Sequence, residues 1–267
     1  MNNVLFAFLL TLFAGLSTAV GGGVVLVFKK ISTKFLSVSL GFSAGVMIYV
    51  SMVEILAESR SILTNSLGES KGELIAVIAF FCGIFLIALI DKLIPSAENP
   101  HEMHSMNLSA QDVTEIDSKK IMRTGLFTAL AIAIHNFPEG LATFIAALQE
   151  PGIAIPVAVA IAIHNIPEGI AVAVPVYYAT KSRKKAFSYS ALSGFSEPLG
   201  PVIGYLLLRP YLSDQLFGIV FAMVAGIMVF ISLDELLPSA HEYGEHHLAI
   251  YGLISGMAVM AVSLLLF

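Results

Sequence analysis

Two stretches of the chain carry the same set of side chains that could bind a metal ion. Residues 131–140 read AIAIHNFPEG and residues 160–169 read AIAIHNIPEG, so nine of ten positions match at a separation of 29 residues. Both copies lie inside long apolar runs, where an ionisable side chain costs roughly 3 kcal/mol on insertion scales. Because each copy places a histidine and a glutamate there, we expect these groups to share a compensating partner.

Helix geometry brings the polar side chains of each copy to one side. The histidine and the glutamate are four residues apart, so they stack on one helix face, and the asparagine lies about 100° round the helix from the histidine. Two such helices packed side by side gather two imidazoles, two carboxylates and two amides within the membrane. The proline of each copy frees a backbone carbonyl, and the glycine allows close helix approach. The predicted ligands of the two copies are His135, Asn136, Glu139, His164, Asn165 and Glu168.

These side-chain types suit divalent metal ions. Two neutral imidazoles and two carboxylates form a good tetrahedral site for Zn²⁺. The two amides suggest a second, oxygen-rich position that shares the carboxylates. Glu197, in the apolar context of the SEP sequence at 196–198, is a candidate for this second position. Such a position suits harder ions of higher coordination number, such as Fe²⁺, Mn²⁺ or Cd²⁺, with less selectivity.

Other polar side chains within apolar runs have weaker patterns. Glu54 and Glu58 are four residues apart near the end of a run, where they could attract cations at an entrance or lie at the membrane interface. Met47 lies deeper in the same run, where a packing role is favoured over thioether ligation. Asp234 and Glu235 lie near the end of a later run, where they could receive an outgoing ion.

The five other histidines lie in polar connections. His101 and His104 belong to the acidic stretch 96–120, whose composition predicts a flexible loop. They could contact metal transiently or simply belong to a solvated linker. His241 begins the HEYGEHH segment at 241–247, which is compatible with a low-affinity metal contact or with ordinary polar loop chemistry.

The composition excludes a soluble domain. Hydrophobic residues make up 57% of the 267 residues and charged residues only 12%, whereas about a quarter of the residues are charged in a typical soluble domain. The net charge of −5 and the absence of a basic stripe disfavour nucleic-acid binding. The single cysteine, Cys82, excludes an internal disulfide framework and a cysteine-based metal cluster.

Eight apolar runs are long enough to cross a membrane as helices, and they lack the alternation over about ten residues that membrane strands show. Of the 14 lysines and arginines, 11 lie in or beside the first, third and fifth connections. The positive-inside rule places these connections in the cytoplasm and therefore both termini outside it. We predict an all-α, polytopic membrane protein of eight transmembrane helices, with a flexible cytoplasmic loop at 96–120. The runs are 4–27, 35–56, 74–94, 121–148, 153–178, 186–208, 216–237 and 248–267.

In these motifs the sequence resembles the ZIP family of divalent-metal transporters. The resemblance rests on the two HNxPEG copies, the SEP sequence at 196–198, the AGVM sequence at 44–47 and the long third connection. It implies that 1–267 is a single transmembrane transport domain in the cell membrane. It further implies uptake of Zn²⁺, often with Fe²⁺, Mn²⁺, Co²⁺ or Cd²⁺, into the cytoplasm by alternating access. The binuclear site implied by the family maps onto His135, Asn136, Glu139, His164, Asn165, Glu168 and Glu197.

Two other mechanisms compete with a carrier. An intramembrane zinc hydrolase favours an HExxH motif, which the chain lacks, and the candidate ligands over-coordinate a hydrolytic zinc, so we expect no enzyme. The sequence gives little evidence to distinguish a channel from a carrier. Tight binding of the ion by many ligands argues for slow release and hence for a carrier. We expect no cofactor, because the metals are transported substrates. The expected partners are divalent metal ions and the lipid bilayer, with a homodimer as an option and without nucleic acid.

Overall fold

The computed structural model describes the backbone of residues 3–27, 32–93, 115–149, 151–208, 211, 213–243 and 246–266. Within these ranges the chain is helical and contains no β-strand, which confirms the all-α class. The helices are α1 (Asn3–Val27), α2 (Thr33–Tyr49), η1 (Val50–Ile55), α3 (Leu56–Leu67), α4 (Glu69–Leu93), α5 (Glu115–Gln149), α6 (Pro151–Thr180), α7 (Arg183–Leu208), α8 (Asp214–Ile231), η3 (Ser232–Leu236), α9 (Leu237–Tyr243) and α10 (His246–Leu266).

Each predicted apolar run falls on one helical segment. The second and seventh runs each combine two α-helices through a π-helical turn, η1 or η3. By length and composition, six segments of the described chain can cross a membrane, which confirms a polytopic membrane protein. These six are Asn3–Val27, Thr33–Leu67, Glu69–Lys92, Ala154–Thr180, Asp214–His241 and His247–Leu265. The two remaining segments, α5 and α7, pack against them along the same bundle.

Helix α5 begins inside the stretch that the sequence predicts to be a loop. Its first residue is Glu115, so residues 115–120 are helical. Residues 96–114, with His101 and His104, lie outside the described residues. Acidic residue types such as Glu115 and Asp117 favour a helix N-terminus because of the partial positive charge there. The predicted loop boundary at residue 120 is therefore wrong, because the first turns of α5 are as polar as the loop before them.

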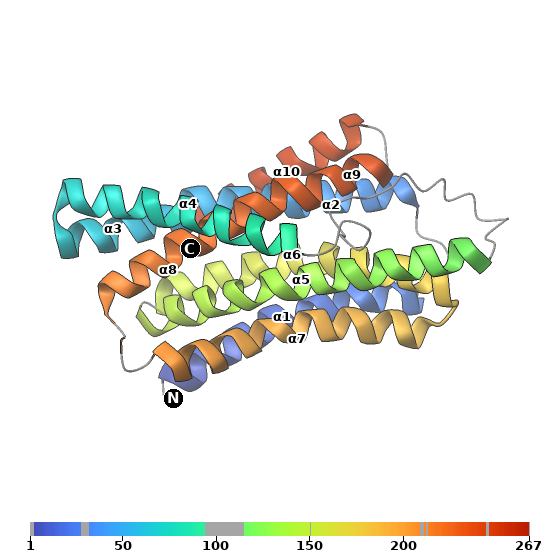
Figure 1. Cartoon of the computed structure of the whole chain (residues 1–267), viewed down its shortest axis with the longest axis horizontal. Coiled ribbons are helices and arrows are strands. Elements are labelled where there is room, and N and C mark those ends of the chain that lie inside the picture. The colour runs from blue at the N-terminus through green and yellow to red at the C-terminus, as the bar shows by residue number, and fades with distance from the viewer. Residues whose placement is uncertain are drawn as a thin grey trace.

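The helices form two groups that lie side by side (Figure 1). One group contains α1, α5, α6 and α7. The other contains the segments α2–η1–α3 and α8–η3–α9 together with α4 and α10. Contacts between the groups are concentrated where α2 packs against α6, with a smaller contact between α5 and α8. The contact between α2 and α6 therefore adjoins the second HNxPEG copy, which α6 carries.

Close helix packing in the first group depends on glycine. A Cβ atom at Gly140 of α5 would collide with the backbone of Glu197 in α7, and one at Gly169 of α6 would collide with the backbone of Thr18 in α1. Both glycines close an HNxPEG copy, so the expectation of close helix approach at these positions is confirmed. The two copies are thereby held close to the helices that flank them.

Helix α6 is the central helix of the protein. In its most apolar window, 83% of the residues are buried inside the protein, compared with 22% for α4 and 28% for the segment of α10. The outer helices thus present apolar side chains to the lipid, whereas α6 is covered by protein. Polar side chains on α6 can therefore be tolerated without contact with acyl chains.

Candidate metal site

The two HNxPEG copies lie in neighbouring helices, α5 and α6, which pack against each other. The backbone of His135 belongs to α5, but its side chain lies outside the described part of the structure. The other polar side chains of the copies are at most 1% exposed; they are Asn136, Glu139, His164, Asn165 and Glu168. Protein therefore encloses this polar cluster within an otherwise apolar bundle.

A direct contact joins the two copies. His164 Nε2 of α6 lies 2.9 Å from Glu139 Oε1 of α5, and both side chains are buried. The four-residue spacing predicts that each histidine lies near the glutamate of its own copy. The structure adds a contact between the copies, which is consistent with the expected side-by-side packing of the two helices.

Helix α7 contributes the carboxylate of Glu197, which is fully buried. Asn165 donates a hydrogen bond of 2.7 Å from its Nδ2 to Glu197 Oε2 and another of 3.1 Å to the carbonyl oxygen of Ala14 in α1. Asn136 donates a longer bond of 3.5 Å to the carbonyl oxygen of Ser193 in α7. Both amide groups are thus oriented by their NH₂ ends, and their carbonyl oxygens remain available as ligands.

Helix α2 reaches the same cluster through Ser43. Its buried hydroxyl lies 3.3 Å from Glu168 Oε1 and 3.3 Å from the carbonyl oxygen of His164. Ser43 belongs to one helix group and Glu168 to the other, so this contact crosses between the groups. The sequence analysis did not identify Ser43, because a serine in an apolar helix has no pattern that indicates a distant carboxylate.

Apart from Glu139 Oε1, which contacts His164, four buried oxygens of the cluster have no hydrogen-bond partner among the described residues. They are Asn136 Oδ1, Glu139 Oε2, Asn165 Oδ1 and Glu197 Oε1. An unsatisfied buried polar group costs about 1–3 kcal/mol. The buried residues that the structure describes include no lysine or arginine to compensate the carboxylates. Carboxylate and amide oxygens in such surroundings fit the ligation of a divalent cation.

The described contacts are pairwise rather than those of an assembled coordination sphere. Among the described side chains, no three histidine, cysteine, aspartate or glutamate residues lie close enough to hold a metal ion together. The side chain of His135 lies outside that set. Two pairs of proposed ligands are in contact: Glu139 with His164, and Asn165 with Glu197. A bound cation would also bring the members of each pair together.

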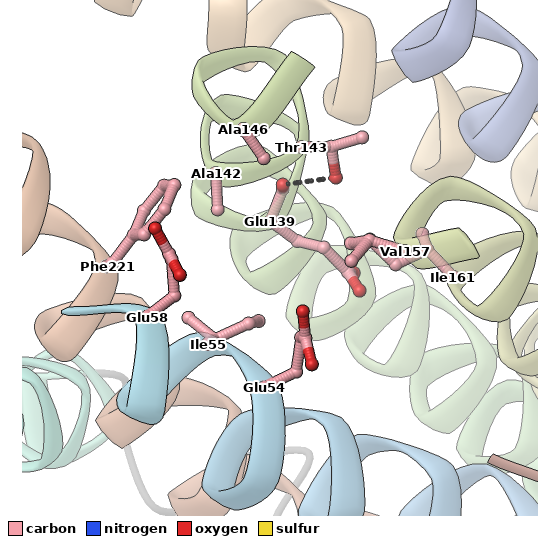
Figure 2. A pocket seen from close by; sticks show the side chains of 10 residues that line it. All are labelled: Glu54, Ile55, Glu58, Glu139, Ala142, Thr143, Ala146, Val157, Ile161 and Phe221. Carbon is pink, nitrogen blue, oxygen red and sulfur yellow. Dashed lines mark hydrogen bonds between the residues drawn. The ribbon is translucent and has the colours of Figure 1, made fainter. Parts of the chain in front are cut away.

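Of the weaker candidates, Glu54 and Glu58 lie beside the cluster, and Met47 lies in the apolar core. Both glutamates line a cavity together with Glu139 (Figure 2). Met47 is fully buried in the main apolar core, which supports the packing role. Asp234 and Glu235 lie in η3 and His241 lies in α9, and both elements pack against α2.

Sequence analysis missed the two π-helical turns and also the second internal repeat in which they lie. Residues 44–56 read AGVMIYVSMVEIL and residues 225–237 read AGIMVFISLDELL. In each copy the serine donates to the methionine carbonyl four residues earlier, at 2.6 Å from Ser51 and 2.7 Å from Ser232. Each π-turn contains the glutamate of the repeat, Glu54 or Glu235. The repeat was visible in the sequence, but its backbone geometry was not.

Comparison with known proteins gives a consistent assignment. A model of the protein family described as ZIP Zinc transporter matches residues 92–264. The chain is 61% identical to the zinc transporter ZupT of Chlorobium chlorochromatii, over 100% of this chain and 99% of that protein. It is 60% identical to the zinc transporter ZupT of Clostridium perfringens, over 100% and 98%, and 63% identical to that of Streptococcus mutans, over 98% and 97%.

Proposed function

Because the chain belongs to the family of ZIP zinc transporters, we propose that it carries Zn²⁺ into the cytoplasm and accepts Fe²⁺, Mn²⁺, Co²⁺ and Cd²⁺ as further substrates. The chain is a multi-pass protein of the cell membrane, and it is a transporter rather than an enzyme. The ions are cargo, so they must bind tightly enough to lose water and weakly enough to leave.

The proposed transport site is binuclear. The observation that carries this proposal is the 2.9 Å contact between Glu139 and His164, which links the two HNxPEG copies inside the protein. One position uses the imidazoles and carboxylates and suits Zn²⁺. The neighbouring position uses the amide oxygens and the carboxylate from α7, and it shares two carboxylates with the first. The proposed ligands are His135, Asn136, Glu139, His164, Asn165, Glu168 and Glu197.

Charge balance supports a shared site for dications. Glu139, Glu168 and Glu197 are at most 1% exposed, and three buried carboxylates are unfavourable without nearby positive charge. A dication between Glu139 and Glu168 offsets two negative charges at once, and a second ion beside Glu197 offsets the third. Loss of one bridging carboxylate therefore weakens both positions.

The proposed orientation places both termini outside the cytoplasm. The start of α1 and the end of α10 lie toward the same end of the bundle as the turn between α3 and α4 (Figure 1). The connections rich in lysine and arginine belong to the opposite end, which the positive-inside rule assigns to the cytoplasm. Residues 1–267 then act as a single transport domain, with the cytoplasmic loop within 96–120.

Zinc uptake by the purified protein in liposomes tests the proposal. Glu139→Ala and Glu168→Ala each remove a bridging carboxylate, so both variants should take up Zn²⁺ no faster than protein-free liposomes. Glu69→Ala, an exposed position at the start of α4, is the matched control and should keep the wild-type rate. Wild-type uptake by a correctly folded Glu168→Ala protein would refute the proposed site.

A further inference from the structure

One face of α7 is exposed along the whole helix and changes from cationic to apolar. Its exposed residues recur every three or four positions, so they share one side of the helix. After residue 188, every exposed side chain that the structure describes on α7 is apolar, with Leu192 66% and Phe195 53% exposed. The first half of this exposed face consists of Lys184, Lys185, Ser188, Leu192, Phe195 and Leu199.

An ordered turn holds the cationic end of the exposed face. Helix α6 ends and α7 begins within a short connection, 181–182. The Ser182 hydroxyl accepts a hydrogen bond of 3.4 Å from the backbone N–H of Lys185. Arg183 donates a hydrogen bond of 2.7 Å to the carbonyl oxygen of Leu26 at the end of α1. These contacts fix the backbone on both sides of Lys184.

The contacts of the described residues leave the charges of Lys184 and Lys185 without a counter-charge. Both lysines are exposed, and neither side chain forms a hydrogen bond or ion pair with a described residue. The sequence contains no aspartate or glutamate from 169 to 196, so no carboxylate lies nearby along the chain. The start of α7 adds the partial positive charge of a helix N-terminus. This end of the exposed face therefore favours an anion.

The position of the exposed face in the membrane indicates which anion fits. The turn between α6 and α7 lies at the opposite end of the bundle from the turn between α3 and α4 (Figure 1). The lysines beside it therefore lie at the depth of lipid headgroups. From Lys185 to Phe195 the helix rises about 15 Å. One leaflet of the hydrocarbon core is also about 15 Å thick, so an acyl chain can cover the apolar side chains that follow Lys185.

We propose that the exposed face of α7 binds an anionic phospholipid, with its phosphate at Lys184 and Lys185 and its acyl chains along Leu192 and Phe195. Basic side chains beside a membrane helix attract anionic headgroups. A second copy of the chain fits this face less well, because a two-fold interface would bring the same lysines of both copies together at one depth. The proposal concerns a lipid rather than the transported ion, so it goes beyond the proposed function.

The bound lipid would stabilise the helix that carries Glu197. The headgroup lies beside Arg183, which ties the start of α7 to the end of α1. Anionic phospholipid should therefore raise the unfolding temperature of the protein in detergent, whereas zwitterionic phosphatidylcholine should not. Each lysine beside an anionic headgroup contributes about fivefold in affinity. Neutralising both Lys184 and Lys185 should thus weaken binding about 30-fold.

Native mass spectrometry of the purified protein, titrated with phosphatidylglycerol, measures the dissociation constant of the first bound lipid. Lys184→Gln/Lys185→Gln should raise this constant about 30-fold. Lys34→Gln/Lys92→Gln is the matched control, because it removes the same charge from α2 and α4, in the other helix group. The control should bind the lipid as the wild type does. Both double variants alter side chains at the ends of helices, and their unfolding temperatures without added lipid verify that they fold.

Three results would overturn the proposal. The first is an equal loss of lipid affinity in the two double variants, which would show a general effect of surface charge. The second is equally tight binding of phosphatidylcholine by the wild type. The third is displacement of the lipid by an equal concentration of glycerol 3-phosphate, which has the headgroup chemistry without acyl chains. None of these measurements involves zinc, so their outcome is independent of the proposed transport function.

Discussion

Gly140→Ala is expected to disturb the proposed metal site without changing any proposed ligand. Gly140 follows Glu139 directly and packs against the backbone of Glu197 in α7. An added Cβ atom would lie 2.9 Å from Glu197 Cγ and closer still to the carbonyl oxygen of that residue. Two carbon atoms normally lie about 3.5–4.0 Å apart, so Glu197 must move by roughly 0.6 Å or more. The substitution therefore separates two proposed ligand carboxylates on adjacent helices.

Two opposing contributions decide the expected stability of Gly140→Ala. Overpacking costs about 1–3 kcal/mol, and more where the backbone must move. Replacing glycine by alanine within a helix returns about 1 kcal/mol of helix propensity. The net effect should be a loss of up to about 2 kcal/mol. Displaced groups at a reacting site lose up to about 100-fold per ångström, so we expect zinc affinity to fall about tenfold.

Thermal unfolding in detergent and zinc binding by calorimetry measure both effects. Gly23→Ala in α1 is the matched control, because a Cβ atom there meets nothing within 4 Å. The control should bind zinc as the wild type does and be at least as stable. If Gly140→Ala also binds zinc with wild-type affinity, close packing of α5 against α7 does not set the position of the Glu197 carboxylate.

Three further outcomes follow from the contacts. Ser43→Ala removes the hydroxyl that lies 3.3 Å from Glu168 Oε1, a contact worth about 1 kcal/mol, so zinc uptake should show a KM about fivefold higher; rescue by Ser43→Thr would support the hydroxyl as the cause. Glu197→Ala should keep residual Zn²⁺ uptake and lose Fe²⁺ uptake, because it removes a ligand of the oxygen-rich position only. Parallel uptake of both ions measures this, and equal losses would contradict two distinct positions. Chelation of all metal should lower the unfolding temperature in detergent, since zinc at 100 times its dissociation constant stabilises the folded protein by about 2.7 kcal/mol; an unchanged unfolding temperature would show that zinc does not bind the folded state preferentially.

The HNxPEG repeat predicted much of the architecture because its information is local. Four-residue spacing places His164 above Glu168 on any α-helix, whatever the rest of the chain does. An ionisable side chain in an apolar run also requires protein cover, so the central place of α6 could be expected. Contact between the two copies followed once both helices were assumed to share an interface, and Glu139 does meet His164.

Other features depend on packing that the sequence does not encode locally. Ser43 is one of several serines in α2, and only the approach of α6 brings it to Glu168. The choice between an interface and an entrance for Glu54 stayed open because helix periodicity does not reveal the cavity behind the residue. The π-helical turns change the register of hydrogen bonds while leaving hydropathy unchanged, so the apolar pattern predicted one uninterrupted helix in each place.

Anomalous diffraction from crystals of the zinc-loaded protein tests most directly whether both HNxPEG copies bind the same ion. We expect an anomalous peak about 2.0–2.2 Å from a Glu139 oxygen and from a His164 nitrogen. We also expect a second metal position beside Glu197, about 3.5–4 Å from the first. A fully occupied zinc peak that contacts only one copy, or that lies away from both α5 and α6, would contradict the shared site.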